Sequence, residues 1–361
     1  MTPKFYPHPR PIETPARPKM RSVVFEEHGG IEKLKYTYAE TPEPGPDEVL
    51  VKVKACALNH LDLWALMGMP GVKIQMPHIL GCDVAGEIAE TGAKVKGLRE
   101  GRAVMLSPGQ PCGRCGFCKS GWDSLCDQYK ILGFQVNGGY AEFVKVPAAS
   151  VLKVSKRLSF EEWAAVPLVF LTAWHMLVTR AGLARGESVL IHAAGSGVGS
   201  AAIQIAKFLG AKVFTTVGSE EKIKRAKAIG ADEVIAYGKK DFPEEIKRIT
   251  GGKGVDVVLE HIGPATFTKS LASLKKKGRL VTCGATSGPM VPLDLRFIFV
   301  RQISVLGCYM GGLGELKKVI SLVEAGKLKP VIDKVFPLRE AACALERMNA
   351  RENFGKILLA P

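Results

Sequence analysis

The sequence of 361 residues contains no apolar run of about 18 residues, the length that a helix needs to cross a membrane. The first 19 residues hold six prolines and lack the apolar centre of a signal peptide. We therefore expect residues 1–19 to form a flexible proline-rich tail, with an arm that packs on a partner subunit as the alternative. Amides are also scarce, with four Asn and six Gln beside abundant Lys and Glu, a balance typical of thermophile proteins. These absences predict a soluble, cytoplasmic protein with no membrane partner.

Positive charge is in excess, because 50 Lys and Arg stand against 35 Asp and Glu and give a net charge of +15. Such an excess raises the hypothesis of a basic zinc protein that contacts nucleic acid. The basic residues are, however, spread along the chain and interleaved with acidic ones, which is typical of a solvated surface. We therefore expect no nucleic-acid partner, and a surface that attracts an anionic cofactor.

Nine cysteines are present, and four of them crowd together as Cys112, Cys115, Cys118 and Cys126. Four thiolates at this spacing close a tetrahedron around Zn²⁺ and leave no position for water or substrate. The sequence predicts one structural zinc in a lobe at about residues 107–130, with an iron–sulfur site or four free thiols as alternatives. The other five cysteines stand in apolar surroundings, as expected of buried residues in a reducing cytosol.

Two kinds of pattern divide the chain, whose length also favours two domains. Up to about residue 155, short β-like runs are broken by Gly and Pro, which indicates a mostly β domain. Residues 158–180 predict a helix, and strands then alternate with helices, which predicts an α/β domain with a doubly wound parallel sheet. The predicted strands are 188–192, 212–217, 233–236, 255–260, 279–283 and 303–308, and the helices between them are 200–209, 219–229, 241–250 and 266–277. We place domain boundaries at 20–168, 169–310 and 311–361, the last segment returning to the first domain.

A glycine-rich turn after the first of these strands is the strongest cofactor signal. It consists of Gly195, Ser196, Gly197, Val198 and Gly199. Small residues let the backbone approach a pyrophosphate, and the following helix offers amide donors and a positive dipole end. A strict G-x-G-x-x-G is absent, but the alternation of strands and helices around the turn supports dinucleotide binding.

The end of the second strand bears on the choice between NAD and NADP. An NAD site usually places an acidic residue there, whereas this chain has Gly218 and Ser219, followed by Lys222. The small pair leaves room for a 2′-phosphate, and the lysine neutralises it. Glu220 and Glu221 follow at once and are expected to be solvated. We therefore predict NADP(H), with Tyr237 flanking the adenosine.

The cysteine and glycine motifs, in this order, resemble the zinc-containing alcohol dehydrogenase and quinone oxidoreductase branches of the medium-chain dehydrogenase/reductase superfamily. Further stretches that support the resemblance are residues 59–64, 77–86, 138–142, 171–174 and 355–359. The resemblance implies a GroES-like catalytic domain, made from both ends of the chain, with a Rossmann domain inserted. It also implies a homodimer or homotetramer, in which strand 303–308 pairs across a two-fold axis.

The resemblance further implies which residues line the cofactor site. Besides the turn and the residues after the second strand, these are Thr172, His261, Cys283, Gly284 and Lys356. We expect the lysine to reach a cofactor phosphate, with a surface lysine as the alternative.

A catalytic zinc in this superfamily needs ligands at three positions, which here hold Asn59, Cys82 with Asp83, and a residue near Leu168 or Val169. Such a set does not supply three good ligands, so we predict that no catalytic zinc is bound. The usual proton-relay residues are replaced by Leu61 and Trp64.

Without a Lewis acid, hydrogen-bond donors must polarise the substrate carbonyl. We predict Asn59, His60 and Asp62 as catalytic residues, with alternatives for the last two. His60 either acts on the substrate, binds the pyrophosphate or lies free in a loop, and Asp62 either binds a ribose or caps a helix. A pocket lined by Trp64, Leu66, Met69, Phe134 and Trp174 would favour a hydrophobic carbonyl or quinone substrate.

The predicted activity is NADP(H)-dependent hydride transfer on hydrophobic ketones, aldehydes or alcohols. The first alternative is reduction of a quinone or enone. A cofactor-binding structural protein without turnover is the second.

Overall fold

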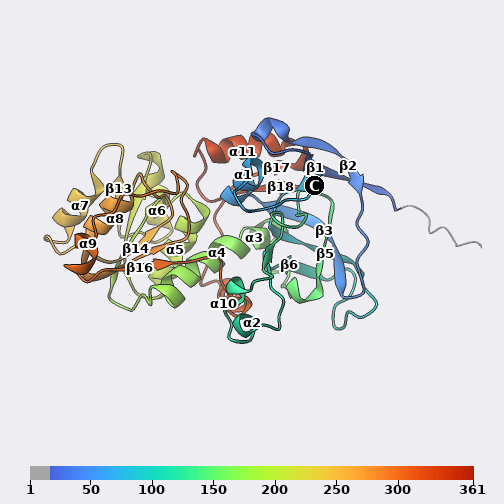
Figure 1. Cartoon of the computed structure of the whole chain (residues 1–361), viewed down its shortest axis with the longest axis horizontal. Helices are drawn as coiled ribbons and strands as arrows, with labels where there is room; N and C mark the ends of the chain where they lie inside the picture. The colour runs from blue at the N-terminus through green and yellow to red at the C-terminus, as the bar shows by residue number, and fades with distance from the viewer. Residues whose placement is uncertain (1–16) are drawn as a thin grey trace, which may run out of the picture.

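The computed structural model describes residues 17–361, which form two lobes with helices between them (Figure 1). Residues 1–16 of the expected tail lie outside the described residues. The remainder of that tail is part of the fold, because Arg17 pairs with Glu90 at 2.8 Å and strand β1 begins at Lys19. The folded chain therefore begins before the predicted boundary at residue 20.

The lobe on the right of Figure 1 is mostly β. Its larger sheet has the strand order β10-β6-β5-β3-β18-β17, with β9 also paired to β3. Its strands are β3 (Glu48–Ala57), β5 (Asp83–Thr91), β6 (Ala103–Leu106), β9 (Phe143–Pro147), β10 (Val151–Lys153), β17 (Ile332–Pro337) and β18 (Lys356–Ala360). Strand β18 pairs with β3, where Leu358 lies opposite Ala57, so the end of the chain completes this lobe.

Two smaller sheets complete the β lobe. One has the order β2-β1-β4, and the other pairs β7 with β8. Their strands are β1 (Lys19–Phe25), β2 (Lys35–Glu40), β4 (His78–Ile79), β7 (Gly109–Gln110) and β8 (Lys130–Ile131).

The other lobe contains a six-stranded parallel sheet, which confirms the predicted doubly wound α/β fold. Its strand order is β13-β12-β11-β14-β15-β16. From β11 the chain adds strands toward one edge of the sheet as far as β13, and from β14 it adds them toward the other edge, so the strand order reverses between β11 and β14, which pair in parallel. The strands are β11 (Ser188–Ile191), β12 (Lys212–Val217), β13 (Glu233–Ala236), β14 (Val255–Glu260), β15 (Leu274–Thr282) and β16 (Ser304–Gly307). The helices are α5 (Gly197–Phe208), α6 (Glu221–Ala228), α7 (Phe242–Ile249), α8 (Phe267–Ser273) and α9 (Arg296–Phe299). Ligands bind such sheets at the carboxyl ends of the strands, near the reversal.

The segment predicted as one helix over residues 158–180 is divided into three. It forms α3 (Phe160–Ala164), α4 (Pro167–Trp174) and a π-helix over His175–Arg180. Pro167 at the first turn of α4 has no amide hydrogen to continue a preceding helix, which explains the break. The predicted helix 266–277 is also shorter, because β15 begins at Leu274.

The remaining helices are α1 (His60–Met67), α2 (Gly116–Lys119), α10 (Leu313–Glu324) and α11 (Ala341–Asn349), with 3₁₀ turns at Ile31–Lys33, Asp123–Leu125, Ala148–Ser150 and Leu338–Glu340. One hydrophobic cluster joins the lobes, since it contains Ala55 of β3, Phe170 of α4 and Val189 of β11. Within residues 17–361, no helix has both the length and the apolar character of a membrane span.

Candidate active site

The glycine-rich turn connects β11 to α5, next to the reversal of the parallel sheet. Ser196 caps α5, because its hydroxyl accepts a hydrogen bond from the amide of Gly199 at 2.9 Å. A Cβ on Gly197 would lie 2.7 Å from the Val169 side chain, and one on Gly199 would lie 2.2 Å from the carbonyl oxygen of Ala193. Larger residues therefore do not fit, and the helix N-terminus stays open to an anion, as a pyrophosphate requires.

Further predicted cofactor residues lie at the carboxyl ends of the strands and on α4. Thr172 is 4% exposed, and among the described residues its hydroxyl has no hydrogen-bond partner. His261 follows β14, and its Nε2 lies 3.1 Å from the carbonyl oxygen of His192. Cys283 and Gly284 follow β15, and burial raises the pKa of the Cys283 thiol to about 12, so it is neutral. The unpaired hydroxyl of Thr172, the glycine-rich turn and the neutral thiol of Cys283 are compatible with a bound dinucleotide.

The residues that follow β12, where we predict a 2′-phosphate site, lie at the surface. Gly218 follows the strand directly, and a Cβ there would lie 2.9 Å from the hydroxyl of Tyr237. Tyr237 is half exposed beside it, and Ser219 is exposed. These three residues therefore lie together at the end of β12.

Lys222 lies near this site but is bound to the backbone. Its ammonium donates to the carbonyl oxygens of Arg351 at 2.7 Å and Asn353 at 2.9 Å. Burial lowers its pKa. The Lys222 side chain also passes Gly195 of the turn, whose carbonyl accepts from the amide of Gly355. Lys222 thus attaches the segment before β18 to the glycine-rich turn.

The side chain of Lys356 passes Gly197 of the glycine-rich turn, but its ammonium is bound elsewhere. Its ammonium donates to the carbonyl oxygen of Leu58 at 2.5 Å, to Asn59 Oδ1 at 2.7 Å and to Asp83 Oδ2 at 3.0 Å. The residue is 4% exposed, so the surface alternative does not hold either. The expectation of a phosphate contact is wrong for this structure, because a buried carboxylate, a side-chain amide oxygen and a backbone carbonyl oxygen accept the three protons of the ammonium.

Asp62 and Asn59 are both engaged inside the protein. The Asp62 carboxylate accepts from the backbone amide of Asn59 at 2.7 Å and from the hydroxyl of Tyr140 at 2.8 Å, and Asp62 is 1% exposed. Burial raises its pKa to about 6. Asp62 therefore caps α1 rather than reaching a ribose. The side-chain amide of Asn59 donates through Nδ2 to Asp83 at 2.8 Å, so this side chain is not free to polarise a substrate.

The remaining residues at the expected metal positions are also occupied. Cys82 Sγ lies 3.3 Å from Asn59 Nδ2, and burial raises the pKa of its thiol far above the ordinary value. The second oxygen of Asp83 accepts from the backbone amide of Leu168 at 2.8 Å. Zinc binds thiolates and free carboxylates, so a neutral thiol and a fully bonded carboxylate form a poor site.

His60 is the one predicted catalytic residue that faces a hollow. The hollow has a volume of about 440 Å³, and its apolar side is formed by Leu63, Trp64, Leu66 and Met67. The imidazole of His60 packs edge-on against Trp64, with ring centres 5.4 Å apart. Burial and the charge of Arg351 lower the pKa of His60, so it is neutral near pH 7.

Arg351 lines the same hollow and was not predicted from the sequence. It lies two positions before Asn353, whose carbonyl oxygen would be 3.2 Å from a Cβ on Gly195. Its positive φ of 58°, unusual for a residue with a side chain, was the feature that sequence reasoning had no means to see.

Three residues of the predicted apolar pocket do not line this hollow. Phe134 and Trp174 are buried in the two main cores, and Met69 is partly exposed to solvent. Trp64 and Leu66 are the members that line it.

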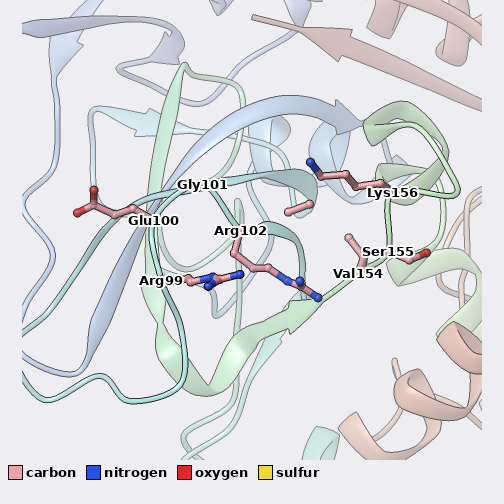
Figure 2. A pocket seen from close by; sticks show the side chains of 8 residues that line it. Arg99, Glu100, Gly101, Arg102, Val154, Ser155 and Lys156 are labelled. Atoms are coloured by element: carbon pink, nitrogen blue, oxygen red, sulfur yellow. The ribbon is translucent and has the colours of Figure 1, made fainter.

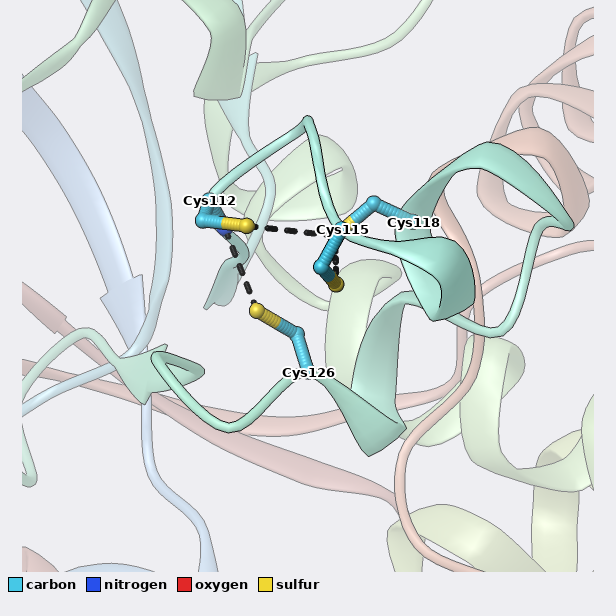
Figure 3. Close-up of side chains that lie close together, drawn as sticks. All are labelled: Cys112, Cys115, Cys118 and Cys126. Carbon is cyan, nitrogen blue, oxygen red and sulfur yellow. Dashed lines mark hydrogen bonds between the residues drawn. The ribbon is translucent and has the colours of Figure 1, made fainter.

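The four clustered cysteines form a separate candidate metal centre (Figure 3). Their sulfur atoms all lie within 4.8 Å of one another, with Cys115 and Cys118 at 3.4 Å and Cys112 and Cys118 at 3.9 Å. A ZnS₄ tetrahedron has sulfur–sulfur edges of about 3.8 Å, which follows from its bond length of about 2.3 Å. Backbone amides at Arg114 and Cys115 lower the pKa of Cys112 to about 6, whereas burial and the side chain of Cys115 raise that of Cys118 to about 12.

The cysteine lobe is attached to the helices between the two large lobes. Trp122 packs edge-on against His175 with ring centres 5.5 Å apart, and Arg180 lies over its ring. The carboxylate of Asp123 accepts from the amide of Leu313 at 2.7 Å, at the N-terminus of α10. The lobe therefore contacts the π-helix and α10.

A larger hollow of about 650 Å³ lies in the β lobe, away from all predicted site residues (Figure 2). It is lined by Arg99, Glu100, Gly101, Arg102, Ala103, Val154, Ser155 and Lys156. Its charged residues are exposed, and none of them has a buried polar neighbour in the hollow. We assign it no role.

Comparison with known proteins gives a consistent picture. Residues 45–156 match the family model "Alcohol dehydrogenase GroES-like domain", and residues 197–325 match "Zinc-binding dehydrogenase". A NAD-dependent alcohol dehydrogenase of Sulfolobus acidocaldarius is 34% identical, over 94% of this chain and 99% of the relative. An acryloyl-coenzyme A reductase of Metallosphaera sedula is 33% identical over 94% and 99%, and a human quinone oxidoreductase is 30% identical over 94% and 97%.

The structural comparison agrees with these relatives. A crystal structure of a NAD-dependent alcohol dehydrogenase, 46% identical, superposes with a TM-score of 0.92 and covers 95% of this chain and 100% of that one. The chain thus spans nearly the full length of its relatives.

Proposed function

Since the chain belongs to the medium-chain dehydrogenase/reductase superfamily, in its branch of zinc-containing alcohol dehydrogenases and quinone oxidoreductases, we propose that it is an NADP(H)-dependent alcohol dehydrogenase or carbonyl reductase without a catalytic zinc. Its substrates would be hydrophobic ketones, aldehydes or the corresponding alcohols. The four-cysteine cluster would hold one structural zinc.

The observation that carries the proposal is the position of the Lys356 ammonium. It contacts Asn59, at the first of the positions that the resemblance implies for zinc ligands, and Asp83, next to Cys82 at the second. A fixed positive charge in this place repels a divalent cation. The ammonium of Lys356 also occupies the carboxylate of Asp83, which a metal would otherwise use as a ligand.

The bound nicotinamide supplies the hydride, and the residues of this chain supply the surroundings. Leu63, Trp64 and Leu66 provide an apolar wall that excludes water from the reacting carbon. His60 is neutral and half-buried at the edge of the same hollow, so it offers an N–H donor to the substrate oxygen. We propose that the N–H of His60 donates a hydrogen bond to the carbonyl oxygen, and that the oxygen takes this proton after hydride transfer while the other ring nitrogen of His60 takes a proton from water.

NADP(H) is proposed over NAD(H) because of the residues after β12. Gly218 and Ser219 leave space for a 2′-phosphate, and no carboxylate follows the strand directly. Several relatives are named NAD-dependent alcohol dehydrogenases, so the proposed preference for NADP(H) rests on these residues and not on the relatives. Ser219→Asp should weaken NADPH binding at least tenfold and leave NADH binding equal or tighter, as measured by nicotinamide fluorescence. Equal binding of both cofactors by the unaltered protein would contradict the proposal.

Reduction of a quinone or an activated carbon–carbon double bond is the second candidate activity. The similarity to an acryloyl-coenzyme A reductase and to a quinone oxidoreductase favours it. NADPH oxidation should be followed with matched hydrophobic ketones, enones and quinones. Faster turnover of ketones supports the first activity, and faster turnover of enones or quinones supports the second. Tight NADPH binding without oxidation by any of them would favour a non-catalytic structural protein.

We also propose a cytoplasmic homodimer or homotetramer. Strand β16 stands at the edge of the parallel sheet, and Val305 within it is 40% exposed. An exposed apolar edge strand is a template for pairing with a second copy.

A further inference from the structure

A buried row of polar side chains crosses the Rossmann lobe beneath the glycine-rich turn. It joins the carboxylate of Glu260, at the end of β14, to the backbone amide of Ala193, at the start of the turn. Ser270 Oγ lies 2.7 Å from Glu260 Oε2 and 2.8 Å from His192 Nε2. Thr216 Oγ1 lies 3.2 Å from His192 Nδ1 and 3.0 Å from the amide nitrogen of Ala193. None of the four side chains is more than 1% exposed.

The two ends of the row fix the direction of its hydrogen bonds. An ionised carboxylate only accepts, so Ser270 donates to Glu260 and must accept from His192 Nε2–H. The Ala193 amide only donates, so it donates to Thr216, whose hydroxyl hydrogen is then free for His192 Nδ1. A neutral imidazole with its proton on Nε2 satisfies every group.

The charge states agree with this direction. Burial lowers the pKa of His192 to about 4, so the ring is neutral near pH 7. Burial acts to raise the pKa of Glu260, but its carboxylate accepts hydrogen bonds from Ser270 and from the backbone amides of Ile262 and Gly263, and these donors act to lower the pKa. Glu260 is therefore the anion at the end of the row.

The amide at the other end belongs to a residue with a strained backbone. Ala193 has a φ of +52°, a conformation that costs about 1 kcal/mol for a residue with a side chain. Its carbonyl oxygen accepts from the amide of Ser196, the residue that caps α5. The conformation of Ala193 thus sets where the amides of the turn point.

We propose that His192 is a positioning residue for the dinucleotide, held as the Nε2–H tautomer so that Thr216 can orient Ala193 and the turn. The proposal rests on the proposed binding of NADP(H). Because hydrogen bonds aligned in one direction strengthen one another, breaking the row at Ser270 also weakens the bond at Ala193.

Three variants test the proposal. Thr216→Val and Ser270→Ala each remove one hydroxyl from the row with little change in volume. Thr215→Val is the matched control, because Thr215 is the buried neighbour on β12 whose hydroxyl donates to the carbonyl oxygen of Ile191, outside the row. We expect Thr216→Val and Ser270→Ala to raise the Kd for NADPH about tenfold, and Thr215→Val to change it less than about twofold. Amide hydrogen exchange at Ala193 should quicken in the first two variants only.

A second readout does not depend on cofactor binding. In cofactor-free protein labelled with ¹⁵N-histidine, NMR should show that Nε2 of His192 is protonated and Nδ1 is not. These signals should not change between pH 6 and pH 8, although an ordinary histidine titrates at about pH 6.5 within that range. A protonated Nδ1, or an equal effect of Thr215→Val and Thr216→Val on Kd, would overturn the inference. If the unaltered protein binds no dinucleotide, the proposed function fails, whereas the tautomer still tests the row by itself.

Discussion

The ammonium of Lys356 lies 3.0 Å from the carboxylate of Asp83, although the two residues are 273 positions apart. Both side chains are at least 96% buried, and Asn59 and Leu58 complete the environment of the charge. This pair attaches the last strand of the chain to the β lobe. It also places a cation in contact with Asn59 and Asp83, on which the proposed absence of a catalytic zinc rests.

Replacing Lys356 with Met should destabilise the protein strongly. The change leaves the Asp83 carboxylate buried without its counter-charge, which typically costs about 3–5 kcal/mol. Urea unfolding should show this as a lower free energy of unfolding. Lys318→Met is the control, because Lys318 lies on the exposed side of α10 and its loss should cost less than about 0.5 kcal/mol. Equal stability of the two variants would mean that the buried pair does not stabilise the fold.

Replacing Arg351 with Gln should weaken the binding of NADPH and of NADH to a similar extent. Arg351 lines the hollow beside His60 and lies two positions before Asn353, whose carbonyl oxygen approaches Gly195 of the glycine-rich turn, so we expect its charge to act on the pyrophosphate that both cofactors share. A lost charged hydrogen bond of about 1.5–3 kcal/mol corresponds to at least about tenfold in Kd. Arg339→Gln removes the same charge from a side chain that is 70% exposed and should leave both Kd values unchanged. A loss confined to NADPH would instead assign Arg351 to the 2′-phosphate.

The folding stability should fall in acid because of His192. Burial lowers its pKa in the folded protein from 6.5 to about 4. Between these values the unfolded chain binds a proton that the folded chain does not, so stability decreases as the pH falls through this window. His192→Phe cannot titrate and should lose less stability than the unaltered protein between pH 6.5 and pH 4. Unfolding by urea at several pH values measures the difference, and parallel curves for the two proteins would contradict it.

Removal of the structural metal should loosen the contact between the cysteine lobe and α10. The lobe has little core, and Asp123 caps the amide of Leu313 from within it. A strong chelator should therefore speed amide exchange at Leu313 and change the fluorescence of Trp122, while exchange in β11 stays slow. Unchanged exchange at Leu313 after complete metal loss would show that the lobe keeps its structure without metal.

Local patterns predicted much of this protein. The cysteine spacing brings four sulfur atoms together within 15 residues, and the strand–turn–helix alternation places the glycine turn, because both depend on near neighbours in the chain. Contacts between distant segments were not predictable in this way. The partners of Lys356 and the location of Arg351 depend on how β18 returns to β3, which no local pattern specifies.

The helix that breaks at Pro167 shows a limit of a different kind. The apolar periodicity over residues 158–180 predicts one helix, but Pro167 within this segment divides it. The capping roles of Asp62 and the buried row at His192 likewise depend on side-chain directions that appear only when strands from different parts of the chain lie side by side.

The zinc content of each chain tests the central claim most directly. Protein purified with zinc present, then freed of loosely bound metal, should contain one zinc per chain, held by Cys112, Cys115, Cys118 and Cys126. A Cys112→Ser, Cys115→Ser double variant should then contain none. Two zinc ions per chain, with one retained by that variant and required for NADPH-dependent turnover, would contradict the account.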